Sequence, residues 1–259
     1  MGEELVHRTI DAGIATITLD SPRNRNALSA QLRRELRDHL AAALAADSVR
    51  VIVLDHTGPV FCAGMDLKES QSADADRQGV RELPELLETL WTSPKPVIAK
   101  LAGPARAGGV GIVAACDLAV AADSATFGFS EVRIGVVPAV ISLTVLPRLQ
   151  PRAAHELFLT GENFDATRAV EIGLLNSAVP AESLDDAVAR YADMLSRGAP
   201  NALAATKELL RRPRAAAIAE DFDTVLELSA SHFASEEGQE GIRAFTEKRP
   251  ATWIPRQAE

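Results

Sequence analysis

Cysteine is scarce in this sequence. Cys62 and Cys116 are the only two cysteines in 259 residues, and they fit neither a disulfide framework nor a metal-ligand spacing. Because disulfides belong to oxidising compartments, a reduced, cytoplasmic protein is the simplest prediction. The first residues, MGEELVHRTI, include acids and no apolar signal-peptide core, so secretion is not expected.

Basic charge and long apolar runs are also in short supply. The chain has 27 Lys and Arg against 36 Asp and Glu, a formal charge of −9, which argues against a nucleic-acid-binding surface. The longest uncharged apolar runs, Ala107–Cys116 and Ile134–Pro147, are too short to span a bilayer, and Pro138 interrupts the second. Neither a nucleic acid nor a membrane is expected as a partner.

Hydrophobic residues are plentiful, at 47%, so the chain can bury one full-sized core, with or without an appendage. Short apolar runs alternate with amphipathic stretches, and this alternation predicts an α/β core with crossover connections. Predicted strands cover Glu4–Ile10, Ile14–Leu19, Val51–Asp55, Val97–Leu101 and Leu118–Ala121, and predicted helices cover Leu28–Leu44, Val80–Trp91 and Val110–Ala115.

The pattern changes beyond about Pro180, where only helical periodicity remains. A helical C-terminal quarter indicates an assembly element or, equally, a lid. The polar stretch Gln71–Gly79 is the best candidate for a mobile loop. The predicted C-terminal helices cover Leu184–Leu195, Ala202–Arg212, Ala215–Phe233 and Gly238–Phe245.

Two turns of small residues are the strongest chemical signal. Each follows a predicted strand, one at Phe61–Gly64 and the other at Ala107–Gly111. Backbone N–H groups at the start of a helix lack intrahelical acceptors, and glycine lets a ligand approach them. Brought together, the two turns would point two donors at one oxygen and form an oxyanion hole.

Two other interpretations of these turns remain open. Either turn alone is more simply explained as tight packing between a strand and a helix. A dinucleotide-binding loop would also use small residues, but Gly108-Gly109-Val110-Gly111 lacks the G-x-G-x-x-G spacing and lies in the middle of the chain.

Five segments together resemble the crotonase superfamily, the enoyl-CoA hydratase/isomerase family. The match covers nearly the whole chain, in order. The segments are FCAGMDLKE from Phe61, the glycine turn that leads to Ala115-Cys116-Asp117-Leu118, FGFSEVRIGVVP at Phe127–Pro138, GENFDATRAVEIGLL at Gly161–Leu175, and AFTEKR at Ala244–Arg249.

The resemblance implies a spiral of ββα units with a C-terminal helical trimerisation region. It suggests a core domain over residues 1–195 and an oligomerisation region over 196–259, assembled as a homotrimer or a dimer of trimers. It also implies an acyl-CoA thioester substrate and no separate cofactor, because coenzyme A is part of the substrate.

The family pattern, carried over residue by residue, assigns the oxyanion hole to the N–H groups of Met65 and Gly108 and the CoA contacts to a wider set. Phe245 and Lys248 would come from a neighbouring subunit. For Arg23 and Arg25 an ordinary solvated loop is almost as good an interpretation, and Phe245 and Lys248 could equally be packing residues. The implied substrate and CoA residues are Arg23, Arg25, Ala27, Ala63, Gly64, Asp66, Leu67, Gly109, Gly111, Pro138, Phe245 and Lys248.

The acid–base residues determine which reaction the resemblance implies. Hydratases of the family use two glutamates; here Glu131 matches one, and Gly111 stands at the position of the other. Glu131 alone could move a proton between carbons, as single-glutamate isomerases do, or it could simply pair with Arg133. Asp66 is expected to cap a helix and Asp117 to be structural.

A second departure is the run from Pro138 to Thr144, which replaces a glycine-rich stretch and would reshape the acyl end. Similar runs occur in relatives that act on branched acyl-CoAs such as methylglutaconyl-CoA. No metal site is expected, and the histidines match no motif: His7, His39, His56, His155 and His232.

The first functional hypothesis is an enoyl-CoA hydratase of fatty-acid or branched acyl catabolism. The second is a single-glutamate enoyl-CoA isomerase. The third, from another class, is an acyl-CoA-binding relative with weak or no catalysis, which Gly111 makes conceivable.

Overall fold

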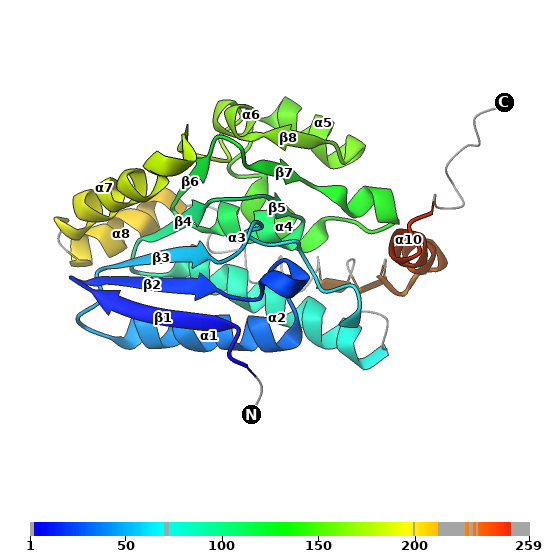
Figure 1. Cartoon of the computed structure of the whole chain (residues 1–259), viewed down its shortest axis with the longest axis horizontal. Helices are drawn as coiled ribbons and strands as arrows, with labels where there is room; N and C mark the ends of the chain where they lie inside the picture. Colours follow the sequence, from blue (N-terminus) through cyan, green and yellow to red (C-terminus); the bar gives the residue numbers. More distant parts are fainter. Residues whose placement is uncertain are drawn as a thin grey trace.

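A six-stranded sheet is the centre of the computed structural model, which describes residues 3–69, 73–198, 200–211, 226–227, 230–231 and 233–249. The strand order is β1-β2-β3-β4-β6-β9 (Figure 1). The bounds are β1 Val6–Asp11, β2 Ile14–Leu19, β3 Val51–His56, β4 Val97–Leu101, β6 Leu118–Ala122 and β9 Ser177–Val179.

The predicted hairpin forms the edge of this sheet. β1 pairs antiparallel with β2 through a turn in which Ala12 and Gly13 have positive φ values of 46° and 82°. All the other pairings in the sheet are parallel. Parallel strands that are covered on both faces consist of continuous apolar runs. The bounds of β3 and β4 could therefore be predicted from the sequence to within one residue.

Helices cover both faces of the sheet. α1 (Ala30–Ala45), α2 (Ala73–Thr92) and α3 (Gly108–Ala115) pack on one face, and α7 (Leu184–Ser196) packs on the other (Figure 1). The predicted leucine stripe of α1 is confirmed, because Leu32, Leu36 and Leu40 are all buried. The side chain of Ser29 caps α1 by accepting from the N–H of Leu32.

A second, smaller sheet has the strand order β5-β7-β8. β5 (Ala105–Arg106) pairs parallel with β7 (Thr126–Gly128), which pairs antiparallel with β8 (Asn163–Asp165). These strands of two or three residues have no periodic pattern, so the sequence did not predict them. The predicted α/β architecture is otherwise confirmed. The remaining elements are η1 Pro22–Asn24, η3 Ser130–Ile134, α4 Ala139–Val145, α5 Pro151–Thr160, α6 Ala166–Glu171, η4 Ala181–Ser183, α8 Pro200–Arg211 and α10 Glu236–Thr246.

The start of α2 corrects the predicted loop. The helix begins at Ala73 and contains Pro84 in its interior, whereas the sequence predicted a loop over Gln71–Gly79 and a helix from Val80. The loop prediction is therefore wrong for residues 73–79, and residues 70–72 lie outside the described part. The segment ADADRQG has no apolar repeat, so periodicity gave no sign of a helix there.

The C-terminal region is helical wherever it is described. α7, α8 and α10 follow β9, and no strand follows β9 in the described ranges. The predicted helix Ala215–Phe233 lies largely outside them, and the division at residue 195 stays a prediction. None of the described helices is long and apolar enough to cross a membrane.

Candidate active site

The two small-residue turns lie against each other. Gly64 has a φ of +91°, and a β-carbon on it would lie 3.0 Å from Cβ of Ala107 and 3.7 Å from the backbone nitrogen of Gly108. The backbones of Cys62 and Ala105 also pair as an isolated parallel β-bridge. The fold thus brings together the two turns that the sequence singled out, and only glycine fits at position 64.

The backbone around Gly108 has the form expected of an oxyanion donor. Gly108 is the first residue of α3, so its N–H has no acceptor within the helix. Ala107 has φ 47° and ψ −119°, a conformation that costs energy for any residue except glycine. This conformation sets the direction of the Gly108 N–H. Among the described residues, neither Met65 nor Gly108 donates a backbone hydrogen bond outside regular helices and strands.

Glu131 lies in η3, directly after β7. Its Oε2 atom is buried and has no hydrogen-bond partner among the described residues. Burial raises the pKa of this carboxyl to about 7. The alternative pairing with Arg133 is wrong, because the Arg133 guanidinium donates instead to the carbonyl oxygen of Thr160 and to the carboxylate of Glu162. A buried carboxyl with one unpartnered oxygen and such a pKa is suited to both accepting and donating a proton at neutral pH.

The position of the missing second glutamate is filled. A β-carbon on Gly111 would lie 2.5 Å from Cγ2 of Ile141 and 3.5 Å from Cδ1 of Leu87. Ile141 belongs to α4, and the hydroxyl of Thr144 in the same helix donates to the carbonyl oxygen of Gly111. α4 begins after the buried Pro138 and packs against α3 at Gly111. The sequence did not indicate this contact.

The loop with the two candidate CoA arginines is joined to the first turn. Arg23 and Arg25 are exposed. The carbonyl oxygen of Arg25 accepts from the N–H of Ala63 at 3.1 Å, and Ala27 is buried beneath the loop. The arrangement agrees with an arginine pair beside the turn, and their contact with CoA stays a prediction.

Asn26 holds this loop in place, a role that the sequence analysis missed. Its side chain is fully buried and accepts from the N–H of Ser21 while donating to the carbonyl oxygens of Thr57 and Val60. Only a side-chain amide supplies a donor pair and an acceptor in one plane. A buried amide next to the arginines thus couples the loop to the segment after β3.

The residues after the first turn have local structural roles. Asp66 accepts from the N–H of Lys68, which forms an Asx-turn, and from the side chain of Asn24, whereas its expected role as a helix cap stays a prediction. Glu69 accepts from the N–H of Ala30 at the start of α1. Leu67 is half-buried beside them. These contacts fix the path of the chain out of the turn.

Three further predicted residues occupy different surroundings. A β-carbon on Gly109 would lie 2.7 Å from both Cβ and the carbonyl oxygen of Cys62, so Gly109 is needed for packing between the turns. Phe245, at the end of α10, is 58% exposed, and Lys248 just after that helix is also exposed. Their contact with CoA in a neighbouring subunit stays a prediction.

No catalytic role is assigned to the cysteine thiols or the described histidines, although Cys62 packs between the two turns. Both cysteines are buried, and burial raises the pKa of the Cys62 thiol to about 12. Nε2 of His56 accepts from the N–H of Ala102, so the ring is a structural acceptor. Nowhere in the described ranges do three His, Cys, Asp or Glu side chains gather in a way that could hold a metal ion.

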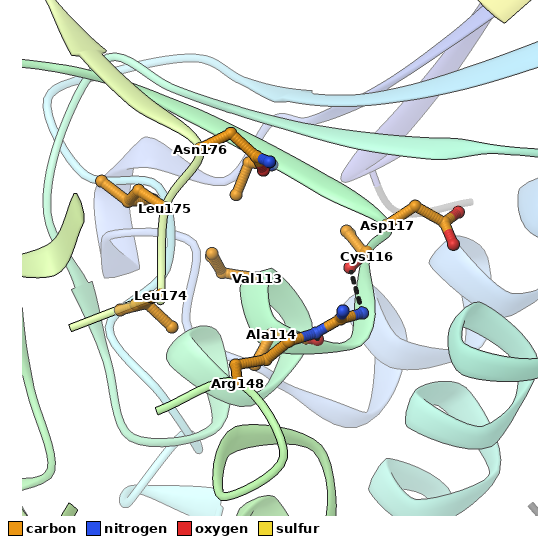
Figure 2. A pocket seen from close by; sticks show the side chains of 10 residues that line it. Val113, Ala114, Cys116, Asp117, Arg148, Leu174, Leu175 and Asn176 are labelled. Atoms are coloured by element: carbon orange, nitrogen blue, oxygen red, sulfur yellow. Dashed lines mark hydrogen bonds between the residues drawn. The ribbon is translucent and has the colours of Figure 1, made fainter. Parts of the chain in front are cut away.

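A small polar cavity lies at the opposite end of α3. It has a volume of about 80 Å³ and contains none of the predicted site residues (Figure 2). Arg148 reaches into it and donates to the carbonyl oxygens of Ala114 and Cys116 (Figure 2). Asp117 accepts from the N–H of Val97 and from the Lys207 ammonium, which confirms its structural role. This end of α3 is a capped helix terminus.

Known proteins resemble the chain over almost its whole length. The model of the enoyl-CoA hydratase/isomerase family matches residues 9–256.

The crystal structure of an enoyl-CoA hydratase from Mycobacterium avium superposes with a TM-score of 0.87 at 44% identity, covering 98% of this chain and 100% of that chain. Carnitinyl-CoA dehydratase of Proteus mirabilis is 34% identical over 259 residues, 96% of this chain and 97% of the relative. The mitochondrial enoyl-CoA hydratase domain-containing protein 3 of Danio rerio is 33% identical over 247 residues, 93% of this chain and 84% of the relative. The predicted crotonase-like fold is thereby confirmed, whereas trimerisation remains a prediction.

Proposed function

Because the chain belongs to the enoyl-CoA hydratase/isomerase family, we propose that it converts an unsaturated acyl-CoA through a thioester enolate with Glu131 as its acid–base residue. The observation that carries the proposal is the buried carboxyl of Glu131, with an unpartnered Oε2 atom and a pKa near 7, just after β7, the strand that pairs with β5 beside the Gly108 turn. The N–H groups of Met65 and Gly108 would hold the thioester oxygen as it gains negative charge.

Water addition to a 2-enoyl-CoA is the first reaction that we propose. The Glu131 carboxylate takes a proton from water as the water oxygen bonds to Cβ, and the Cα=Cβ electron pair moves toward the thioester oxygen. Glu131 then returns the proton to Cα, so that one molecule of water is added and the enzyme is unchanged. The hydratase and dehydratase names of the relatives support this choice.

Double-bond migration is the second candidate, and the glycine at position 111 favours it. Glu131 would remove a proton from Cα of a 3-enoyl-CoA and deliver it to Cγ, which requires one carboxyl and no held water. The Ile141 side chain against Gly111 leaves no room for a second carboxylate. A relative that binds acyl-CoA with weak or no catalysis is the remaining alternative.

The substrate, the cofactor requirement, the localisation and the assembly are part of the same proposal. The substrate would be a fatty or branched acyl-CoA, with methylglutaconyl-CoA as one branched example, and no cofactor besides the substrate's CoA would be needed. A cytoplasmic homotrimer or dimer of trimers would carry out the reaction.

Parallel assays of the wild type distinguish the three possibilities. Loss of crotonyl-CoA absorbance reports hydration, and conversion of a 3-enoyl-CoA to its conjugated 2-enoyl isomer reports migration. Turnover in the first assay supports hydratase function, and turnover in the second alone supports isomerase function. Acyl-CoA binding without turnover in these assays or with a branched 2-enoyl-CoA would overturn the proposed catalysis.

A further inference from the structure

Two departures from the family pattern, at position 111 and in the run from Pro138 to Thr144, meet in space. The apolar branch of Ile141 occupies the space into which a side chain at Gly111 would project, 2.5 Å from the β-carbon position. Ile141 is itself 3% exposed, and Leu87 of α2 closes the same space at 3.5 Å. Leu87 is fully buried as well, so both neighbours are enclosed by other side chains.

The helix that carries Ile141 is also held on α3 by a polar contact. Thr144 is fully buried, and its hydroxyl donates to the carbonyl oxygen of Gly111 at 3.2 Å. The acceptor of this bond, Gly111, is the residue whose α-carbon faces Ile141. The same hydroxyl lies 3.2 Å from the carbonyl oxygen of Ile141 in its own helix, so the contact with Gly111 favours close packing of α4 on α3 and still permits a small shift of α4.

Gly111 lies one helical turn from Gly108, so the two residues share a face of α3. A carboxylate at position 111 would start on the face of α3 that contains the α-carbon of Gly108. The Ile141 side chain fills the space that this carboxylate would need and presents an apolar surface there. Such a surface would favour an apolar acyl group over an ordered water at this side of the site.

We infer that Ile141 is a specificity-determining residue which, paired with Gly111, limits this active site to the single carboxyl of Glu131. The inference deepens and rests on the proposed function, and it predicts that positions 111 and 141 are coupled. A glutamate at 111 is incompatible with the isoleucine, and shortening the isoleucine makes it compatible. Ile141→Ala leaves a β-carbon at 3.0 Å, which a small shift of α4 relieves.

A double-mutant cycle tests the coupling. It compares the wild type, Gly111→Glu, Ile141→Ala and the double variant by thermal unfolding and by crotonyl-CoA hydration. Val140→Ala combined with Gly111→Glu is the matched control. Val140 is buried in α4 to a similar degree, and it supplies none of the three heavy atoms nearest to the β-carbon position of residue 111.

The expected result is a large drop in unfolding temperature and activity for Gly111→Glu. The Ile141→Ala double variant should recover several degrees and gain roughly tenfold in hydration over Gly111→Glu, less than the ~10²–10⁴ that a fully positioned acid–base group supplies. The Val140→Ala control should recover neither quantity. Wild-type stability of Gly111→Glu, or equal recovery with Val140→Ala, would overturn the inference.

Failure of the proposed function looks different. In that case the wild type has no turnover that depends on Glu131, while the unfolding temperatures still report whether residues 111 and 141 are coupled. Coupling in stability without any gain in hydration would overturn the specificity role of Ile141 and leave only packing.

Discussion

The N–H of Ala107 donates to the carbonyl oxygen of Gly128 at 3.1 Å. This bond ties the turn before α3 to the end of β7, and Glu131 follows only three residues later. The proposed oxyanion donor at Gly108 and the proposed acid–base residue are therefore fixed to one piece of backbone. Their relative position depends on hydrogen bonds of the small sheet, to which the Arg106 side chain adds by donating to the carbonyl oxygen and the hydroxyl of Thr126.

The Gly108 N–H can be tested by a pair of substitutions. Gly108→Pro removes the donor at a first-turn position where proline is tolerated, and we expect activity to fall by ~10²–10³. Gly108→Ala keeps the donor and adds a β-carbon 3.0 Å from Cδ1 of Leu28, a flexible atom that can move. Most activity should survive in the alanine variant.

Steady-state turnover of both variants, with circular dichroism to confirm folding, measures the difference. Equal losses in the two folded variants would show that added bulk matters and that the donor does not.

The Asn26 amide can be tested through stability. Asn26→Ala leaves the Ser21 N–H and the carbonyl oxygens of Thr57 and Val60 without their partner. We expect the free energy of unfolding in urea to fall by about 2–4 kcal/mol. Asn24→Ala is the control, since it loses one contact of 3.3 Å to Asp66 and should change stability far less.

The raised pKa of Glu131 predicts a pH-dependent difference in stability. The carboxyl titrates near 4.5 in the unfolded chain and near 7 in the fold, so the folded state holds its proton more tightly between these values. The stability contributed by protonated Glu131 is complete below pH 4.5 and is lost as the pH rises to about 7.

Glu131→Gln removes this loss. Its free energy of unfolding should rise relative to the wild type by up to about 3 kcal/mol between pH 4.5 and pH 8. Urea titrations across that range measure the difference. Glu162→Gln, at an exposed carboxylate, is the control and should show a flat difference. A flat difference for Glu131→Gln as well would mean that the carboxyl is not buried in solution.

The sequence predicted those elements whose pattern reports burial. β3 and β4 are continuous apolar runs, and α1 has a leucine at every fourth position, so each could be predicted within one or two residues. The small strands β5, β7 and β8 are held by hydrogen bonds over two or three residues. Such short segments have no period to detect.

Some residues of the candidate site could likewise be predicted from the sequence, and others could not. The turns at Gly64 and Gly108 and the acid Glu131 could be predicted, because they stand in segments that match the motifs of a known family in order. Ile141 and Asn26 could not, since their importance lies in contacts with Gly111 and Val60 that are distant in the sequence. An isoleucine in an apolar run looks the same whether it fills a core or an active-site recess.

The central claim is that Glu131 performs the proton transfer. The most direct test is the turnover of Glu131→Gln on the better of crotonyl-CoA and a 3-enoyl-CoA, beside the wild type and the Glu162→Gln control. The account predicts a loss of at least ~10² for Glu131→Gln, with folding and CoA affinity retained, and near wild-type turnover for the control. Near wild-type turnover of a folded Glu131→Gln variant would contradict it.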